Sequence, residues 1–183
     1  MMTVPNKEPK VYGFSALKIT KMLTDVAGAA PTYDDENSIV IRGAVNLKYD
    51  ENVQEVEGRG DERILEVEYK DDKAGVTWET LYFPMEAAKM VNGGTVVTGT
   101  DDVEYFGPGP DEIGEYFKIE GLSKDKKVKQ TYHKVKGRIK LGGFTGGDFV
   151  NATFDGTAIH TTGDVQGKPR RVSVKQSSTP IEV

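Results

Sequence analysis

The sequence contains no cysteine, one tryptophan and two histidines among its 183 residues. Without cysteine, neither a disulfide nor a thiolate metal site can form. His133 and His160 lie far apart in strand-like runs, so they give neither a zinc-binding spacing nor a base beside a nucleophile. The absence of a Gly-x-Ser-x-Gly turn also argues against acyl-transfer chemistry. We therefore expect no enzyme activity, no metal and no cofactor.

Long hydrophobic runs are missing as well. The N-terminus, MMTVPNKEPK, is polar, and no stretch approaches the ~20 apolar residues of a membrane span. Hydrophobic residues make up 37% of the chain and glycine occurs 21 times, which indicates a modest core with many turns. We expect a soluble protein made in a cytoplasm, folded as one domain over residues 1–183, with an N-terminal arm at 1–10 and a C-terminal tail at 179–183.

The charges are distributed unevenly. Residues 1–120 hold 12 Lys and Arg against 24 Asp and Glu, whereas residues 121–183 hold 12 against 5. Every second position of one basic run is a cation, which in a strand would place four on one face: Lys134, Lys136, Arg138 and Lys140. The net charge of −5 opposes nucleic-acid binding by this stripe. Two interpretations remain, an attraction to acidic residues within or between identical subunits, and a merely solvated surface.

The segment GGFTGG, beside this stripe, does not have the composition of a phosphate-binding loop. Such a loop needs Gly-Lys-Ser/Thr leading into a helix, whereas this one joins two alternating runs. It is therefore predicted to be a hairpin loop between two strands.

Most of the chain alternates in the manner of β-strands separated by turns. The predicted strands cover 11–20, 38–49 with a bend at Gly43, 63–70, 76–83, 95–100, 115–122, 129–141, 148–159 and 170–176. The segment PMEAAKMVNGG predicts the one helix, with proline in its first turn and glycine at its end. Trp78 is expected in a core strand. The pattern is typical of a mainly β fold, an antiparallel β-sandwich or open barrel with one short flanking α-helix.

The segment DENVQEVEGRGDE is acidic and has no sustained apolar face. It predicts a long acidic loop over residues 50–61 or a mobile hairpin, and loops of this length are often functional. In the run that follows, Glu62, Glu66 and Glu68 share one face opposite Leu65, Val67 and Tyr69.

Several segments together resemble the major tail proteins, or tail tube proteins, of long-tailed bacteriophages. They are KVYGFSALKIT, APTYDDENSIVIRGAVNLKYDEN, the stretch from FKIEGLSKD to KVKGRIKLGG, and the final FDGTAIHTT and GKPRRV. Thr32 and Tyr33, then Gly43, Ala44 and Val45, follow the order of turn, strand and acidic loop in that family. The resemblance covers most of the chain.

The resemblance implies a two-sheet β-sandwich with a flanking helix. Six subunits would form a ring, and rings would stack into a tube whose lumen conducts DNA without binding it specifically. The implied partners are further copies of the chain and the tail terminator, tape-measure and tail-tip proteins, with no membrane involved. The protein would belong to the virion tail, assembled in the cytoplasm of the bacterial host.

The resemblance to tail tube proteins also suggests roles for the charged residues. Contacts between subunits or rings are expected from Asp50, Glu51, Glu55, Glu57, Arg59, Asp61, Lys134, Lys136, Arg138 and Lys140. Glu62, Glu66 and Glu68 are expected to face the lumen and repel DNA phosphates, although the cationic stripe is an alternative lining. Two other functions stay open, a tube protein of a bacterial contractile injection or secretion system, and a non-catalytic β-sandwich binding module.

Overall fold

The computed structural model describes residues 14–41, 43–51, 54–60, 63–70, 73–82, 84–109, 114–142, 152–163 and 170–174. Its elements are β1 (Phe14–Thr24), β2 (Thr32–Tyr33), β3 (Ile39–Ile41), β4 (Ala44–Glu51), β5 (Gln54–Gly60), β6 (Arg63–Lys70), β7 (Lys73–Thr80), α1 (Met85–Asn92), β8 (Thr95–Thr98), β9 (Val103–Phe106), β10 (Phe117–Ser123), β11 (Val128–Leu141), β12 (Ala152–Ile159) and β13 (Arg170–Val174).

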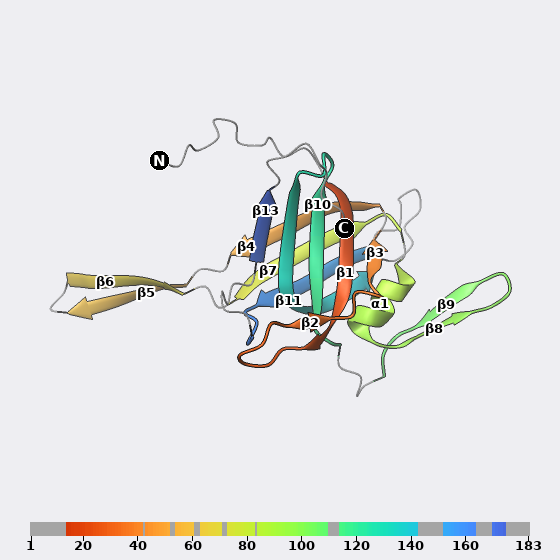
Figure 1. Ribbon diagram of the computed structural model, residues 1–183, viewed down its shortest axis with the longest axis horizontal. Helices are drawn as coiled ribbons and strands as arrows, with labels where there is room; N and C mark the ends of the chain where they lie inside the picture. Colours follow the sequence, from red (N-terminus) through yellow and green to blue (C-terminus); the bar gives the residue numbers. More distant parts are fainter. Residues whose placement is uncertain are drawn as a thin grey trace.

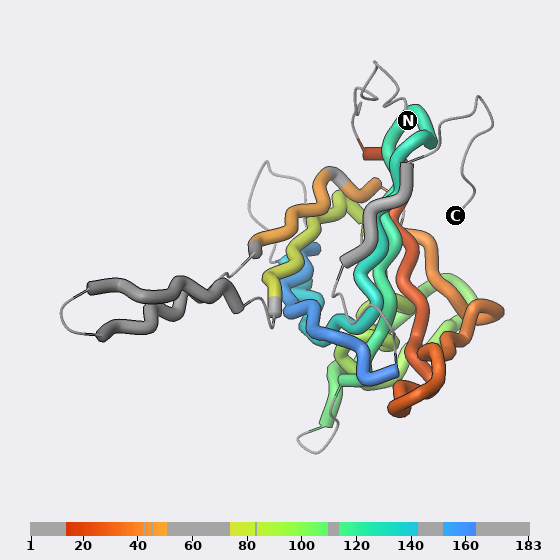
Figure 2. The backbone as a smooth tube through the Cα atoms, turned by 60° about the vertical axis from the view of Figure 1, so that its left-hand side comes forward, coloured from red at the N-terminus to blue at the C-terminus, as the bar shows by residue number. Residues whose placement is uncertain are grey.

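The main sheet has nine antiparallel strands and folds over itself into two layers. Its order is β2-β1-β10-β11-β12-β7-β4, with β3 added to β1 and β13 added to β11. Strands β1, β10, β11 and β13 run in one layer, and β4, β7 and β12 cross behind them (Figure 1). Figure 2 shows the same layers from the side, with β4 and β7 on one side and β1 and β10 on the other. The expected mainly β, antiparallel, sandwich-like fold with one helix is confirmed.

Strand β11 joins the two layers because it is 14 residues long. Its first part pairs with β10 and its last part with β12, and Val135 has a partner in both. The pairing with β12 runs without a break from Val135 to Leu141. The segment GGFTGG therefore connects two antiparallel neighbours, as predicted, although most of it lies outside the described residues.

The core lies between the layers, and its largest members are aromatic side chains packed among aliphatic ones. Trp78 of β7 stacks on Phe154 of β12 with ring centroids 5.4 Å apart, and Phe117 of β10 meets Phe154 edge-on at 5.6 Å. Tyr49 of β4 stacks on Tyr132 of β11. These contacts link strands that are distant in sequence, and each fully buried aromatic side chain contributes several kcal/mol, about 3–5 by truncation. The placement of Trp78 in a core strand is confirmed.

Helix α1 closes one end of the sandwich. Its buried face consists of Ala87, Ala88 and Val91, and Gly93 ends it with φ +86°. The side-chain amide of Asn92 accepts a hydrogen bond from the N–H of Ile139 and donates one to its carbonyl, both at 2.8 Å. The pairing of β10 with β11 ends at Val135, so no residue of β10 pairs with Ile139. The Asn92 amide instead satisfies the backbone N–H and C=O of Ile139.

Gly43 marks the point at which the chain passes from one layer to the other. Strand β3 pairs with β1, whereas β4, which begins one residue after Gly43, pairs with β7. Gly43 has φ +64°, and a Cβ atom at this position would collide with the ring of Tyr82. The bend predicted here is confirmed, and its geometry favours glycine for both reasons.

Two antiparallel ribbons, β5–β6 and β8–β9, form separate two-stranded sheets that leave the body (Figure 1). The prediction of a long acidic loop over 50–61 is wrong within the described residues, because Asp50 and Glu51 end β4 and residues 54–60 form β5. The hairpin alternative is met only in part, because residues 54–60 form one strand of a hairpin whose second strand is β6. The sequence predicted β6 correctly but not its separation from the main sheet, and it gave no signal for β9. The arm at 1–10 and the tail at 179–183 lie outside the described residues.

Candidate assembly surface

The cationic stripe lies on the outer face of β11. A β-bulge makes this possible: Ile119 of β10 pairs with Tyr132, whereas Phe117 pairs with Val135, so β11 has one extra residue. Tyr132 and Val135 are therefore both buried, and the alternation after the bulge places Lys134, Lys136, Arg138 and Lys140 opposite the core. The predicted shared face is confirmed.

Lys134, at one end of the stripe, is tied to its own chain. Its Nζ lies 2.6 Å from Oδ2 of Asp25, and the two side chains are only 14% and 7% exposed. Asp25 also accepts hydrogen bonds from the backbone N–H groups of Thr162 and Gly163, at 2.8–3.0 Å. Burial by itself raises the pKa of Asp25, but these hydrogen bonds outweigh it and lower the pKa from 3.8 to about 2.

Tyr116 connects the first two cations of the stripe. Its ring centroid lies 4.8 Å from Nζ of Lys134 and 5.1 Å from Nζ of Lys136, within the range of cation–π attraction. A shallow hollow of about 370 Å³ lies here, lined by Met22, Leu23, Thr24, Asp25, Glu115, Tyr116 and Lys134. Leu23 is 57% exposed and Tyr116 36%, so this end of the stripe carries an apolar patch.

The other members of the stripe are open to solvent. Lys140 lies 3.5 Å from Asp155, but both side chains are about two-thirds exposed, so the pair contributes little. Arg138 is exposed and Lys136 half-buried, and neither has an ion pair with another described residue. The stripe therefore has one internally neutralised end and two available cations beyond it.

A second charged cluster surrounds Glu120 of β10 and is internal to the sheet. Its carboxylate lies 2.7 Å from Nζ of Lys129 and 3.5 Å from Nζ of Lys118. Burial raises the pKa of Glu120, but the hydrogen bond from Lys129 and the charges of both lysines together lower it. Because these groups already satisfy one another, this cluster holds β10 and β11 together.

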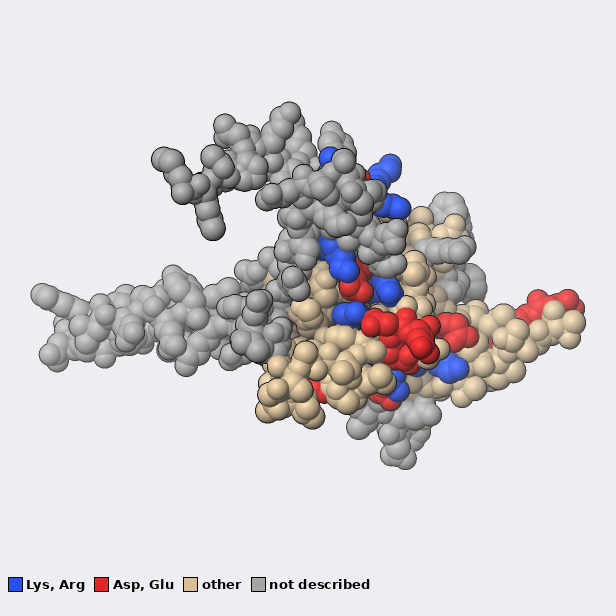
Figure 3. All heavy atoms as spheres, in the orientation of Figure 1, with Lys and Arg blue, Asp and Glu red and all other residues tan. Residues whose placement is uncertain are grey.

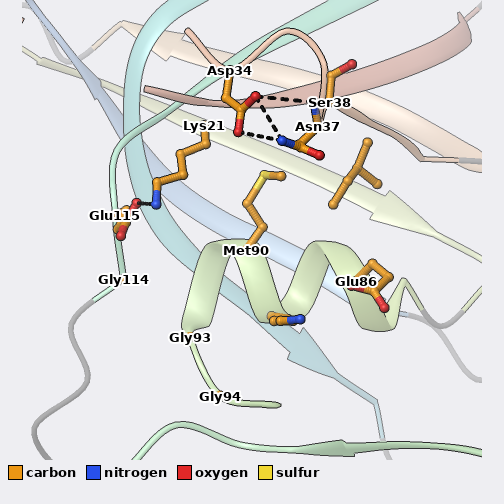
Figure 4. A pocket seen from close by; sticks show the side chains of 12 residues that line it. Lys21, Asp34, Asn37, Ser38, Glu86, Met90, Gly93, Gly94, Gly114 and Glu115 are labelled. Carbon is orange, nitrogen blue, oxygen red and sulfur yellow. Dashed lines mark hydrogen bonds and ion pairs between the residues drawn. The ribbon is translucent and has the colours of Figure 1, made fainter. Parts of the chain in front are cut away.

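A groove of about 700 Å³ lies between α1 and the loop that follows β2 (Figure 4). Met90 points into it from the helix, while Lys21 forms a 2.6 Å ion pair with Glu115 at its rim. Asp34 accepts hydrogen bonds from the side chain and backbone of Asn37. Lys21, Glu115 and Asp34 at this groove therefore already interact with residues of their own chain.

The charged residues of 50–68 that were predicted to make contacts or to face the lumen fall on the ribbon β5–β6 and the strand before it, apart from two outside the described residues. Asp50 and Glu51 end β4, Glu55, Glu57 and Arg59 belong to β5, and Glu66 and Glu68 belong to β6. Asp61 and Glu62 lie outside the described residues. The expectation that Glu66 and Glu68 lie on a strand of the sandwich is wrong, because β6 pairs with β5 in a separate sheet. Their lumen-facing role stays a prediction.

The ribbon β8–β9 exposes an unusual amount of apolar surface. Val97, Val103 and Phe106 are 47%, 44% and 55% exposed. Val103 also lines a largely apolar groove of about 780 Å³, together with Ile39, Val40, Tyr82 and Met85 of the body. Two-stranded ribbons are marginally stable by themselves, and exposed apolar patches of this kind mark contact sites. Sequence reasoning predicted a strand over 95–100 but missed its partner β9, because Val103–Phe106 is short and leads into a turn-rich segment.

Among the described residues, no group of three or more His, Asp or Glu is placed to hold a metal ion. The acid pairs at 34–35 and 101–102 belong to no such group. His133 lies in β11 and His160 directly after β12, both half-buried. In the same part of the chain, no helix is long and apolar enough to span a membrane.

No model of a known protein family matches the sequence, and no curated protein sequence matches it either.

Proposed function

We propose that the chain is the structural subunit of a phage tail tube, which assembles into stacked hexameric rings around a lumen that conducts DNA. The observation that carries the proposal is the pair of ribbons leaving a sandwich body, one of them with exposed apolar side chains on both strands. Surfaces of this kind suit a protein that is completed by neighbouring copies. The sequence resemblance to the tail tube family points the same way.

Two further features support a role in assembly. Strand β4 ends the main sheet and pairs only with β7 in the described order, so its outer edge is available to a strand from a neighbour. The cations Lys136 and Arg138 are available on a chain whose first two-thirds are acidic. Contacts between unlike surfaces of identical copies close into rings or continue as filaments.

The structure weakens the alternative of a carbohydrate-binding module. Such modules present flat aromatic faces to their ligands, but the one tryptophan, Trp78, is fully buried between the layers. A tube protein of a contractile injection system would use the same surfaces, and the neighbouring genes would distinguish it from a phage tail protein.

The test is negative-stain electron microscopy of the purified protein over a range of concentrations, together with sedimentation velocity. We expect rings or hollow tubes that grow with concentration. A protein that remains monomeric at every concentration and is retained on a glycan column would overturn the proposal in favour of a binding module.

A further inference from the structure

One face of the ribbon β8–β9 carries an apolar residue and two acids in line. The register pairs Thr95 with Phe106 and Val97 with Glu104, so these four side chains share a face. At the end of the ribbon the N–H of Gly99 donates to the carbonyl of Asp102, which extends the ladder by one step. A Cβ atom on Gly99 would meet the carboxylate of Asp102, which places this carboxylate on the same face.

This ribbon face, defined by Phe106, Glu104 and Asp102, is exposed to solvent. All three residues are exposed, and neither acid has an ion pair with another described residue. Acidic atoms are visible at the outer end of the ribbon on the right of Figure 3. The face therefore reads apolar, acidic, acidic at every second position toward the tip.

The outer face of β11 carries the complementary order. It begins at the hollow formed by Leu23 and Tyr116 beside Lys134, and continues with Lys136 and Arg138 at every second position. Asp25 neutralises Lys134 and Lys21 pairs with Glu115 at the hollow, so the residues of β11 present an apolar site followed by two cations. One further acid, Asp155 of β12, lies opposite Arg138 in the register. Each series spans four residues of extended chain, about 13 Å at ~3.3 Å per residue.

We propose that the ribbon face of one copy docks on this β11 face of a second copy. Phe106 enters the hollow between Leu23 and Tyr116, Glu104 meets Lys136, and Asp102 meets Arg138. Charge sign, apolar position and spacing agree at all three points, which is the complementarity that selects a partner and its register. The partner is another copy, since the ribbon points away from β11 on the far side of α1 in its own chain (Figure 1).

The contact joins two different surfaces, so every copy offers one donor and one acceptor, and the arrangement propagates into a ring or a filament. The inference deepens the proposed function, on which it rests for the identity of the final assembly. The docking itself is a property of two surfaces and is measurable without any tube.

The first experiment uses two complementary variants. The ribbon variant carries Asp102→Lys and Glu104→Lys, and the stripe variant carries Lys136→Glu and Arg138→Glu. Each variant alone lacks one half of the contact and is expected to sediment as a monomer. Mixed together, the two variants can form the original contact and its charge-reversed counterpart, so a complex of alternating copies in a 1:1 ratio should form. Raising the salt from 0.15 M to 1 M should weaken this complex, because screening acts on exposed charges.

The matched control reverses two exposed lysines outside the stripe, Lys126→Glu and Lys127→Glu, in the turn between β10 and β11. This variant has the same charge change as the stripe variant and should assemble as the original chain does. A chain carrying all four reversals of the ribbon and stripe variants regains complementary charges and should assemble again. Circular dichroism confirms that each variant is folded.

The second experiment uses the absence of cysteine in the chain. Glu104→Cys in one copy and Lys136→Cys in another should form an intermolecular disulfide under mild oxidation. The pair Glu104→Cys and Lys126→Cys should not. Equal cross-linking of both pairs, or none in the first, would overturn the proposed register.

The outcomes separate the two proposals. A 1:1 complex from mixed variants upholds the docking, even if the original chain never forms tubes and the proposed function falls. Tubes that form equally well from the ribbon variant and the stripe variant overturn the docking and leave the tube function standing. Mixed variants that remain monomeric also overturn the docking.

Discussion

The sandwich body and the ribbon β8–β9 are built from the same kind of alternating sequence, but they differ in what covers them. In the body, Trp78, Phe117 and Phe154 are almost completely buried against one another across the two layers. In the ribbon, Val97, Val103 and Phe106 remain about half exposed. The apolar side chains of the body are covered by other parts of the chain, whereas one face of the ribbon is left uncovered by the described residues. Large apolar residues that a single chain leaves uncovered are the part of a protein that assembly can bury.

The largest expected change in stability comes from removing an aromatic side chain in the body, compared with the same change in the ribbon. Phe154→Ala removes a ring that contacts both Trp78 and Phe117, and it should lower the free energy of unfolding by about 4 kcal/mol. Phe106→Ala, the matched change in the ribbon, should alter monomer stability by less than about 0.5 kcal/mol while weakening assembly. Urea unfolding of both variants at low concentration measures the difference. Equal destabilisation would show that the ribbon is part of the cooperative core.

The second effect compares a buried ion pair with an exposed one. Lys134→Met leaves Asp25 charged in a mostly buried site and should cost about 3 kcal/mol, the low end for such pairs. Lys140→Met removes the pair with Asp155 at the exposed end of the same stripe and should cost under about 0.5 kcal/mol. Thermal unfolding of the two variants at neutral pH checks the contrast.

The pH dependence of stability provides a second test of the buried ion pair between Asp25 and Lys134. The pKa of Asp25 is lowered from 3.8 to about 2 in the folded chain, so its contribution is fully present above about pH 4. It is lost as the pH falls through 2, because the unfolded state binds the proton first. Asp25→Asn should therefore flatten the loss of stability between pH 4 and pH 2. An unchanged slope would contradict the assignment.

The smallest effect compares two glycines. Gly43→Ala forces an alanine to φ +64° and against Tyr82 at the point where the chain changes layers, and it should cost about 1–2 kcal/mol. Gly107, directly after the ribbon, has open space around its Cα, so Gly107→Ala should be nearly neutral or slightly stabilising. Urea midpoints of the two variants measure this. A neutral Gly43→Ala would mean that the chain relaxes at the layer crossing.

Much of the fold could be predicted because strands follow local alternation. The bounds of β6 and of α1, the bend at Gly43 and the burial of Trp78 all depend on residues that are near neighbours in sequence. The ribbon β5–β6 was only half predicted, because the acidic segment before β6 contains just two valines, three residues apart, which do not give the alternation of a strand. Strand β9 was missed because four residues between turns carry little periodicity.

The sequence by itself determined that the chain is mainly β, that one helix lies near residue 88, and that four cations alternate along β11. The tertiary structure decided which of these cations remains available. The bulge between Tyr132 and Val135 determines which face of β11 carries the stripe. Lys134 is neutralised by Asp25, which is more than 100 residues away in the sequence. Alternation defines two faces of a strand through the local geometry of the backbone. Only long-range pairing and packing decide which face meets the core, which meets a counter-charge, and which is left for another molecule.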